Sequence, residues 1–137
     1  MDVSKYRKDF PILNSDDSPI YLDSACMTLR PQAVIEAITD YYTNYPACGG
    51  RSVHKLSWQV TENFEMARDS LRRFMGAESS SEIVFTKNAT ESMNIVANGL
   101  NLTKGDEVLT SDKEHNANVV PWHHLAKHKG IKYDVLP

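Results

Sequence analysis

Residues 82–92 read EIVFTKNATES, and within this stretch a strand pattern gives way to a helix pattern. The segment 82–86 carries β-branched and aromatic side chains, which are typical of strands. The residues from Ala89 to Leu100 predict a helix. A strand that runs directly into a helix is the building unit of α/β folds, so this stretch predicts a fold of the α/β class.

The same alternation extends outward from this stretch in both directions. Toward the C-terminus we expect a strand at 106–110, a helix at 117–129 closed by Gly130, and a strand at 131–136. Toward the N-terminus we expect a helix at 57–75 stopped by Gly76, a helix from Pro31 to near Pro46, and a brief strand at 20–22. The pattern therefore predicts an incomplete mixed or parallel sheet with helices on its faces, after a helical N-terminal third.

The composition and the charge argue against several classes of protein. The 137 residues are 41% apolar and 24% charged with a net charge of −3, which is typical of one folded domain rather than a disordered chain. The charge gives no reason to expect a nucleic acid or an anionic membrane as partner. No apolar run reaches the ~18 residues of a membrane span, and the first residues lack a signal-peptide pattern. Cys26 and Cys48 make no disulfide framework, and we expect ordinary thiols of a reducing cytoplasm.

The strand-to-helix junction at 86–92 is the first candidate site. Free N–H groups at a helix start, together with the helix dipole, suit a phosphate group, and Thr90 would add a hydroxyl. The alternative is simple capping by Asn88 or Thr90 with no ligand. The junction lacks the glycine-rich pattern of a nucleotide-binding P-loop.

The junction at 111–118 is the second candidate site. His115 would project over the same sheet edge as Thr90, where an imidazole can exchange protons or offer a flat face for stacking. The alternative is a polar surface histidine. Three more histidines lie in the helix that follows, but they lack the ligand pattern of a zinc site, so we expect no metal.

The loop at 46–54 is the third candidate site. Gly49 and Gly50 let its backbone turn sharply or approach another group closely. Arg51 offers a planar fork of N–H donors that suits a carboxylate. The alternative is a flexible surface loop.

Five segments together carry a resemblance to a known family and stand in that family's order along nearly the whole chain. They are Tyr21–Ala25 (family YLDNAA), Arg51–Ser57 (HRGxHxLS), Glu82–Asn94 (EIVFTxGTTExxN), Gly105–Val108 (GDEI) and Glu114–Trp122 (EHHxNxVPW). The chain thus resembles the N-terminal part of class V aminotransferase-fold enzymes, in particular the SufS-like cysteine desulfurase and selenocysteine lyase group. It departs from the family pattern at Gly50 and Asn116, where relatives have histidine.

The resemblance implies a cofactor, pyridoxal 5′-phosphate (PLP), and roles for single residues. Ala89 and Thr90 would hold the cofactor phosphate, and His115 would stack on its ring and assist proton transfers. Arg51 and His54 would lie on the substrate side, in a homodimer, and the reaction would mobilise sulfur from L-cysteine and pass it to an enzyme thiol.

The resemblance also implies a division of the chain and a limit on its activity. Residues 1–30 would form an N-terminal arm with the first strand, and 31–137 part of the PLP-binding large domain of fold type I. None of the lysines stands in the family's cofactor-linking motif, so we expect these residues to be inactive alone. The alternatives are another class V enzyme, such as a selenocysteine lyase, or a non-catalytic small α/β module.

Overall fold

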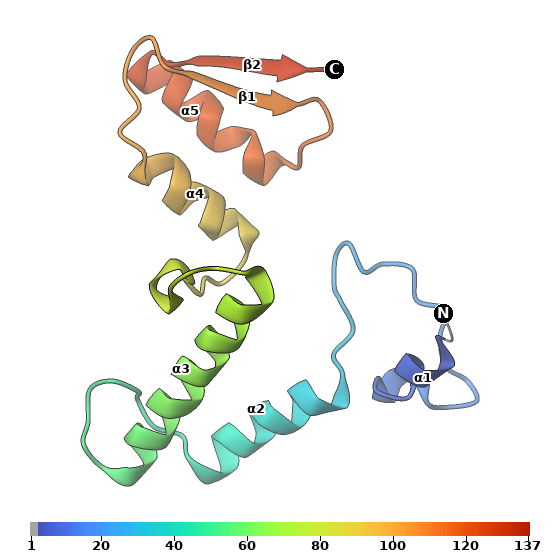
Figure 1. The fold of residues 1–137 in the computed structure, drawn as a ribbon. Helices are drawn as coiled ribbons and strands as arrows, with labels where there is room; N and C mark the ends of the chain where they lie inside the picture. Colours follow the sequence, from blue (N-terminus) through green and yellow to red (C-terminus); the bar gives the residue numbers. More distant parts are fainter. Residues whose placement is uncertain (1–2) are drawn as a thin grey trace. The chain divides into compact units, whose positions relative to one another are not determined.

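The computed structural model describes residues 3–137 and divides the chain into two compact units, 1–80 and 81–137. Figure 1 gives the order of helices and strands along the chain.

The first unit is helical. It contains α1 (Ser4–Arg7), the short 3₁₀ helix η1 (Pro11–Leu13), α2 (Gln32–Asn44) and α3 (Lys55–Met75), and η2 (Ser80–Glu82) follows at its end. The two predicted long helices are confirmed. Pro31 precedes α2 in extended backbone, and Gly76 ends α3. The third helix begins two residues before the predicted start because His54 caps it.

The second unit has the α/β order that the sequence predicts. It contains α4 (Ala89–Gly99), β1 (Glu107–Ser111), η3 (Asn116–Asn118), α5 (Val120–Lys129) and β2 (Lys132–Leu136). The two strands are parallel, with Glu107 opposite Lys132 and Ser111 opposite Leu136. Because α5 connects parallel strands, the segment is a crossover unit. The predicted α/β class is confirmed.

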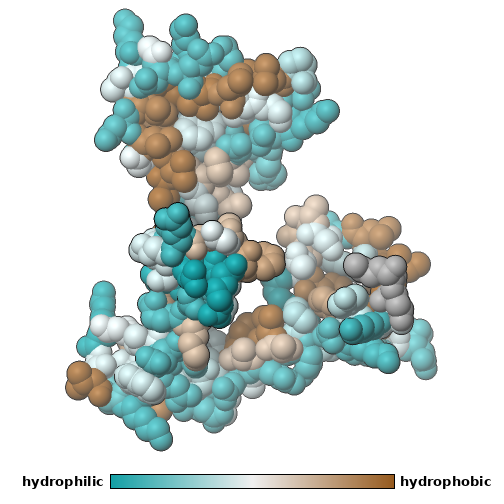
Figure 2. All heavy atoms as spheres, in the orientation of Figure 1, coloured by the Kyte–Doolittle hydropathy of each residue, from teal (hydrophilic) through white to brown (hydrophobic). Residues whose placement is uncertain are grey.

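The hydrophobic core of the described residues sits in this second unit. Its buried members are Ala97, Trp122, Leu125 and Ile131, and partly buried side chains from α4, β1 and β2 surround them. In the first unit Tyr45 is the buried apolar residue, while the apolar side chains of α2 and α3 remain largely exposed. Apolar atoms also reach the visible surface of the part that holds β1 and β2 (Figure 2), where Leu109 and Leu136 are about half exposed.

Two predicted strands are wrong. Residues 20–22 and 82–86 form no strand, and Ile20 and Leu22 are 90% and 89% exposed. A strand needs a neighbour to pair its N–H and C=O groups, and no described segment pairs with either stretch. The predicted helix at 117–129 begins only at Val120, because residues 116–118 form the 3₁₀ turn and Pro121 stands at the start of α5. The division at residue 30 stays a prediction.

Within the described part of the chain, every helix falls short of the length or apolar character that crossing a bilayer demands.

Candidate cofactor-binding site

The start of α4 is a capped helix N-terminus. Asn88 has extended backbone, and its Oδ1 accepts a hydrogen bond from the N–H of Glu91 at 2.9 Å. The Glu91 carboxylate turns back and accepts from the N–H of Lys87 at 2.6 Å, and the Lys87 ammonium lies 3.8 Å from its other oxygen. The structure therefore selects Asn88 as the cap, and Thr90 is left out of the capping.

Capping does not use up the donors at this helix start. Of the first N–H groups, those of Glu91 and Ser92 have partners, whereas the described residues offer none to the N–H groups of Ala89 and Thr90. The Thr90 hydroxyl is likewise without a partner, and both residues are exposed. Three free donors at the positive end of a helix suit the phosphate group of PLP. Capping by Asn88 and anion binding are thus compatible at this junction.

Thr86 and Ser92 brace the turn that leads into α4. Their hydroxyl oxygens lie 2.7 Å apart, so one hydroxyl donates to the other, and the hydroxyl that accepts can donate to the carbonyl oxygen of Asn88, which lies within 3.3 Å of both. These contacts hold the backbone ahead of Ala89 although residues 82–86 form no strand. The junction therefore keeps its shape through side-chain hydrogen bonds instead of a sheet ladder.

His115 lies at the start of η3, and α4 contacts η3. The structure thus places His115, Ala89 and Thr90 in one unit. The Nδ1 atom of His115 accepts from the N–H of Ala117 at 3.1 Å, and its carbonyl oxygen accepts from the N–H of Asn118 at 2.8 Å. Because Nδ1 accepts, the neutral ring carries its proton on Nε2. The exposed imidazole therefore has a fixed tautomer and a face free for a ligand.

The loop at 46–54 is held against α3. The hydroxyl of Ser57, which is fully buried, donates to the carbonyl oxygen of Cys48 at 2.6 Å. The N–H of Gly50 donates to the Thr61 hydroxyl at 2.8 Å, and that hydroxyl donates to the Ser57 carbonyl oxygen at 2.9 Å. These contacts attach the glycine segment of the loop to α3, whereas the flexible-loop alternative stays open.

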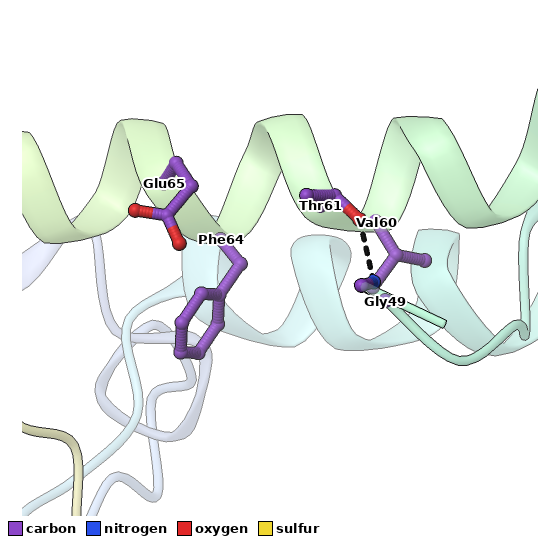
Figure 3. A pocket seen from close by; sticks show the side chains of 6 residues that line it. Gly49, Val60, Thr61, Phe64 and Glu65 are labelled. Atoms are coloured by element: carbon purple, nitrogen blue, oxygen red, sulfur yellow. Dashed lines mark hydrogen bonds between the residues drawn. The ribbon is translucent and has the colours of Figure 1, made fainter. Parts of the chain in front are cut away.

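The surroundings of both loop glycines favour a residue without a side chain. Figure 3 shows the glycine segment against Val60 and Thr61 of α3, beside a hollow of about 350 Å³ that Phe64 and Glu65 also line. A Cβ atom on Gly49 would lie 3.1 Å from Val60 Cγ1. Gly50 has φ +73°, a left-handed conformation that residues with a side chain rarely adopt. The backbone at position 50 therefore favours glycine.

Arg51 and His54 belong to the first unit. Arg51 follows the glycine segment, and its guanidinium is exposed with no partner among residues 3–137. His54 caps α3, because its Nδ1 accepts from the N–H of Ser57 at 3.3 Å. The capping roles of His54 and His115 were not predicted from the sequence, where their signal is their place directly before a helix.

The other histidines and the cysteines among the described residues form no second candidate site. His124 and His128 share one face of α5 with ring centroids 4.3 Å apart, and His123 packs on Tyr133. Among the described residues, no group of three or more histidine, cysteine or acidic side chains is placed to hold a metal ion. Cys26 and Cys48 are both free and exposed.

Several known proteins are similar to this chain in sequence and in structure. The aminotransferase class-V family model matches residues 20–137. A probable cysteine desulfurase from Halalkalibacterium halodurans is 41% identical over 143 residues, which cover all of this chain and 35% of that protein. The apo structure of a cysteine desulfurase from Thermococcus onnurineus NA1 is 38% identical with a TM-score of 0.88, and the match covers 98% of this chain and 33% of that one.

A more distant relative carries a cofactor. The cystine C–S lyase C-DES is 27% identical with a TM-score of 0.69, over 80% of this chain and 28% of that one, and one of its structures has glycine covalently linked to PLP. The chain spans about a third of the length of the curated relatives it matches. Its ordered motifs, its α/β unit and the match over residues 20–137 agree, and the chain belongs to the aminotransferase class-V family.

Proposed function

We propose that this chain is the segment of a PLP-dependent, cysteine desulfurase-like enzyme that holds the cofactor phosphate and ring. The observation that carries the proposal is the set of three exposed, unused donors at the start of α4: the N–H groups of Ala89 and Thr90 and the Thr90 hydroxyl. The cysteine desulfurases among the relatives and the PLP in a C-DES structure support it.

The residues present fit the cofactor in charge and in shape. A phosphate dianion would meet the positive end of the α4 dipole, while the nearby Glu91 carboxylate is already engaged by Lys87. His115, held by its Nδ1 bond, offers a flat face to a planar ring. When bound, PLP supplies the electron sink for breaking bonds next to the α-carbon of an amino acid.

The substrate we propose is L-cysteine, whose sulfur the whole enzyme would mobilise. The free fork of Arg51 suits the carboxylate of an amino acid, and His54 stands three residues further along the same segment. We place both residues on the substrate side of a cytoplasmic homodimer. Since no lysine here stands in the family's cofactor-linking motif, residues 1–137 would bind PLP reversibly and release no sulfur by themselves.

The phosphate site is tested by titrating PLP with the 137-residue chain and following the phosphorus-31 resonance. Replacing Thr90 by valine keeps the volume and removes one hydroxyl donor to a charged group, so we expect affinity to fall about tenfold. Thr39→Val is the matched control, because the exposed Thr39 hydroxyl donates only within α2, to Ile35. Equal affinities of the Thr90→Val and Thr39→Val variants would refute the assignment.

A second experiment identifies the reaction. Protein made from the complete gene is incubated with PLP and L-cysteine, and we expect sulfur release with alanine as the carbon product. Pyruvate and ammonia would instead indicate a C–S lyase, the alternative favoured by the similarity to C-DES. Selenide released only from selenocysteine would indicate a selenocysteine lyase, and failure to bind PLP at all would indicate a non-catalytic α/β module.

A further inference from the structure

A chain of hydrogen bonds connects the core of the second unit to the loop that carries His115. Trp122 is 5% exposed, and its Nε1–H donates to Asn118 Oδ1 at 2.9 Å. Asn118 Nδ2 then donates to Glu114 Oε2 at 2.9 Å, and the hydroxyl of Ser111 donates to Glu114 Oε1 at 3.1 Å. The chain thus runs from a buried indole to the end of β1.

The direction of these bonds is fixed by chemistry. An indole N–H can only donate, so the Asn118 amide must turn its oxygen toward Trp122 and its nitrogen toward Glu114. The nitrogen needs an acceptor, which the Glu114 carboxylate supplies. The hydrogen bond from Asn118, followed by that from Ser111, holds the pKa of Glu114 below its ordinary value, so the carboxylate stays charged at neutral pH.

His115 lies between Glu114 and Asn118 in the sequence, but its own side chain takes no part in this chain of hydrogen bonds. Glu114 precedes it directly, and Asn118 binds its carbonyl oxygen through the backbone N–H. The Nδ1 bond to Ala117 lies between those two anchors. If Asn118 and Glu114 separate, the turn that presents the Ala117 N–H to the ring loses its support from the core.

We propose that Glu114 and Asn118 are positioning residues for His115, which fix the imidazole on the Ala117 N–H and so preserve its Nε2-protonated tautomer. This inference deepens the proposed function, on which the role of His115 toward the cofactor ring rests. The two residues act only through His115, and neither is assigned a contact with substrate or cofactor. The property that they control, the tautomer of one ring, can be measured without any cofactor.

The test uses variants that break and then restore the hydrogen bond between residues 118 and 114 by exchanging donor and acceptor groups. Asn118→Asp keeps the acceptor for Trp122 but sets a carboxylate oxygen against Glu114, where two acceptors repel. Adding Glu114→Gln restores a donor at that contact, since the glutamine amide can donate to Asp and accept from Ser111. Asp112→Asn is the control for a change of charge in this loop: it removes one negative charge, as Glu114→Gln does, and the Asp112 carboxylate has no partner among the described residues.

The readout is the nitrogen-15 spectrum of the His115 ring at neutral pH in the chain without PLP. We expect the ratio of Nε2-protonated to Nδ1-protonated ring to fall about fivefold in Asn118→Asp and to recover in the double variant. The control should keep the ratio of the unaltered protein. Thermal unfolding of each variant is recorded in parallel, so that an effect on the tautomer of His115 can be distinguished from an effect on the stability of the fold.

The outcomes distinguish this inference from the proposed function. If Asn118→Asp lowers the unfolding temperature but leaves the ring ratio unchanged, the two residues are structural only and the inference is wrong. If the ring ratio responds as expected but PLP leaves the His115 resonances unmoved, the positioning inference stands and the role of His115 toward the cofactor fails. If Asp112→Asn also lowers the ratio of Nε2-protonated to Nδ1-protonated ring, then the charge of the loop controls the tautomer of His115, and not the direction of the hydrogen bonds. That result would also overturn the inference.

Discussion

The contact that fixes the glycine loop to α3 is open to a direct energetic test through Ser57→Ala. Ser57 is fully buried, and its hydroxyl donates to the Cys48 carbonyl oxygen at 2.6 Å. The same helix carries Ser70, whose exposed hydroxyl donates to the Met66 carbonyl oxygen at 2.8 Å and makes no contact with a loop. Ser70→Ala is therefore the control for removing a serine hydroxyl from this helix without touching the loop; it differs from Ser57→Ala in that Ser70 is exposed and also accepts from Arg73 Nη2 at 3.3 Å.

The expected magnitude follows from the surroundings of the two hydroxyls. Losing the bond from Ser57 costs about 1 to 1.5 kcal/mol. Cys48 is exposed as a residue, so we count the lost hydrogen bond alone and add no desolvation cost for its carbonyl group. Alanine returns roughly 0.5 kcal/mol of helix propensity in both variants, and the exposed Ser70 bond contributes little. The difference between the variants is thus about 1 kcal/mol, or about fivefold in the opening equilibrium of the loop.

The assay is hydrogen exchange at the Gly50 amide, whose N–H donates to the Thr61 hydroxyl. Exchange under conditions where opening is in equilibrium should be about fivefold faster in Ser57→Ala and unchanged in Ser70→Ala. Thr61→Val removes the acceptor itself and sets the upper limit of the response. Equal exchange rates in the two serine variants would show that the hydroxyl of Ser57 does not hold the loop, and the reasoning would fail.

Three further predictions concern the second unit, and each is measured by thermal or urea unfolding. Asn88→Ala removes the acceptor for the Glu91 N–H and should destabilise the unit by about 1 kcal/mol. Gly130→Ala places a Cβ at φ +70° and should cost at least about 1 kcal/mol, whereas Gly99→Ala, with nothing within 4 Å, should be neutral or stabilising. Hydrogen bonds lower the pKa of Glu114, so its stabilising effect should be complete above pH 4.5 and lost as pH falls further, and Glu114→Gln should flatten that acid limb.

The sequence predicts those elements that local patterns determine. The 3.6-residue apolar stripe of α3 and the stop at Gly76 are local, and both are confirmed. The strands β1 and β2 are predicted within one residue at each end, because the alternation of strand and helix is local too. A pattern of side chains is enough for these elements, since their partners lie nearby in the chain.

The failures arise where structure depends on a distant partner. Residues 82–86 have strand composition, but a strand forms only where another strand accepts its hydrogen bonds. The chain from Trp122 to Glu114 was equally beyond prediction, because it depends on the amide of Asn118 turning one way. The motif at 114–122 gives the residue types, but the direction of donors and acceptors appears only in three dimensions.

His54 and His115 share one feature that narrows the chemistry open to each. In both rings Nδ1 accepts from a backbone N–H a few residues further along. For His54 this is the N–H three residues on, at 3.3 Å, and for His115 it is the N–H two residues on, at 3.1 Å. The neutral ring therefore presents its N–H donor at Nε2 while Nδ1 is engaged by the backbone. Such a histidine is suited to stack on a ring or to donate a hydrogen bond. For His115 this agrees with the ring contact that we propose for it.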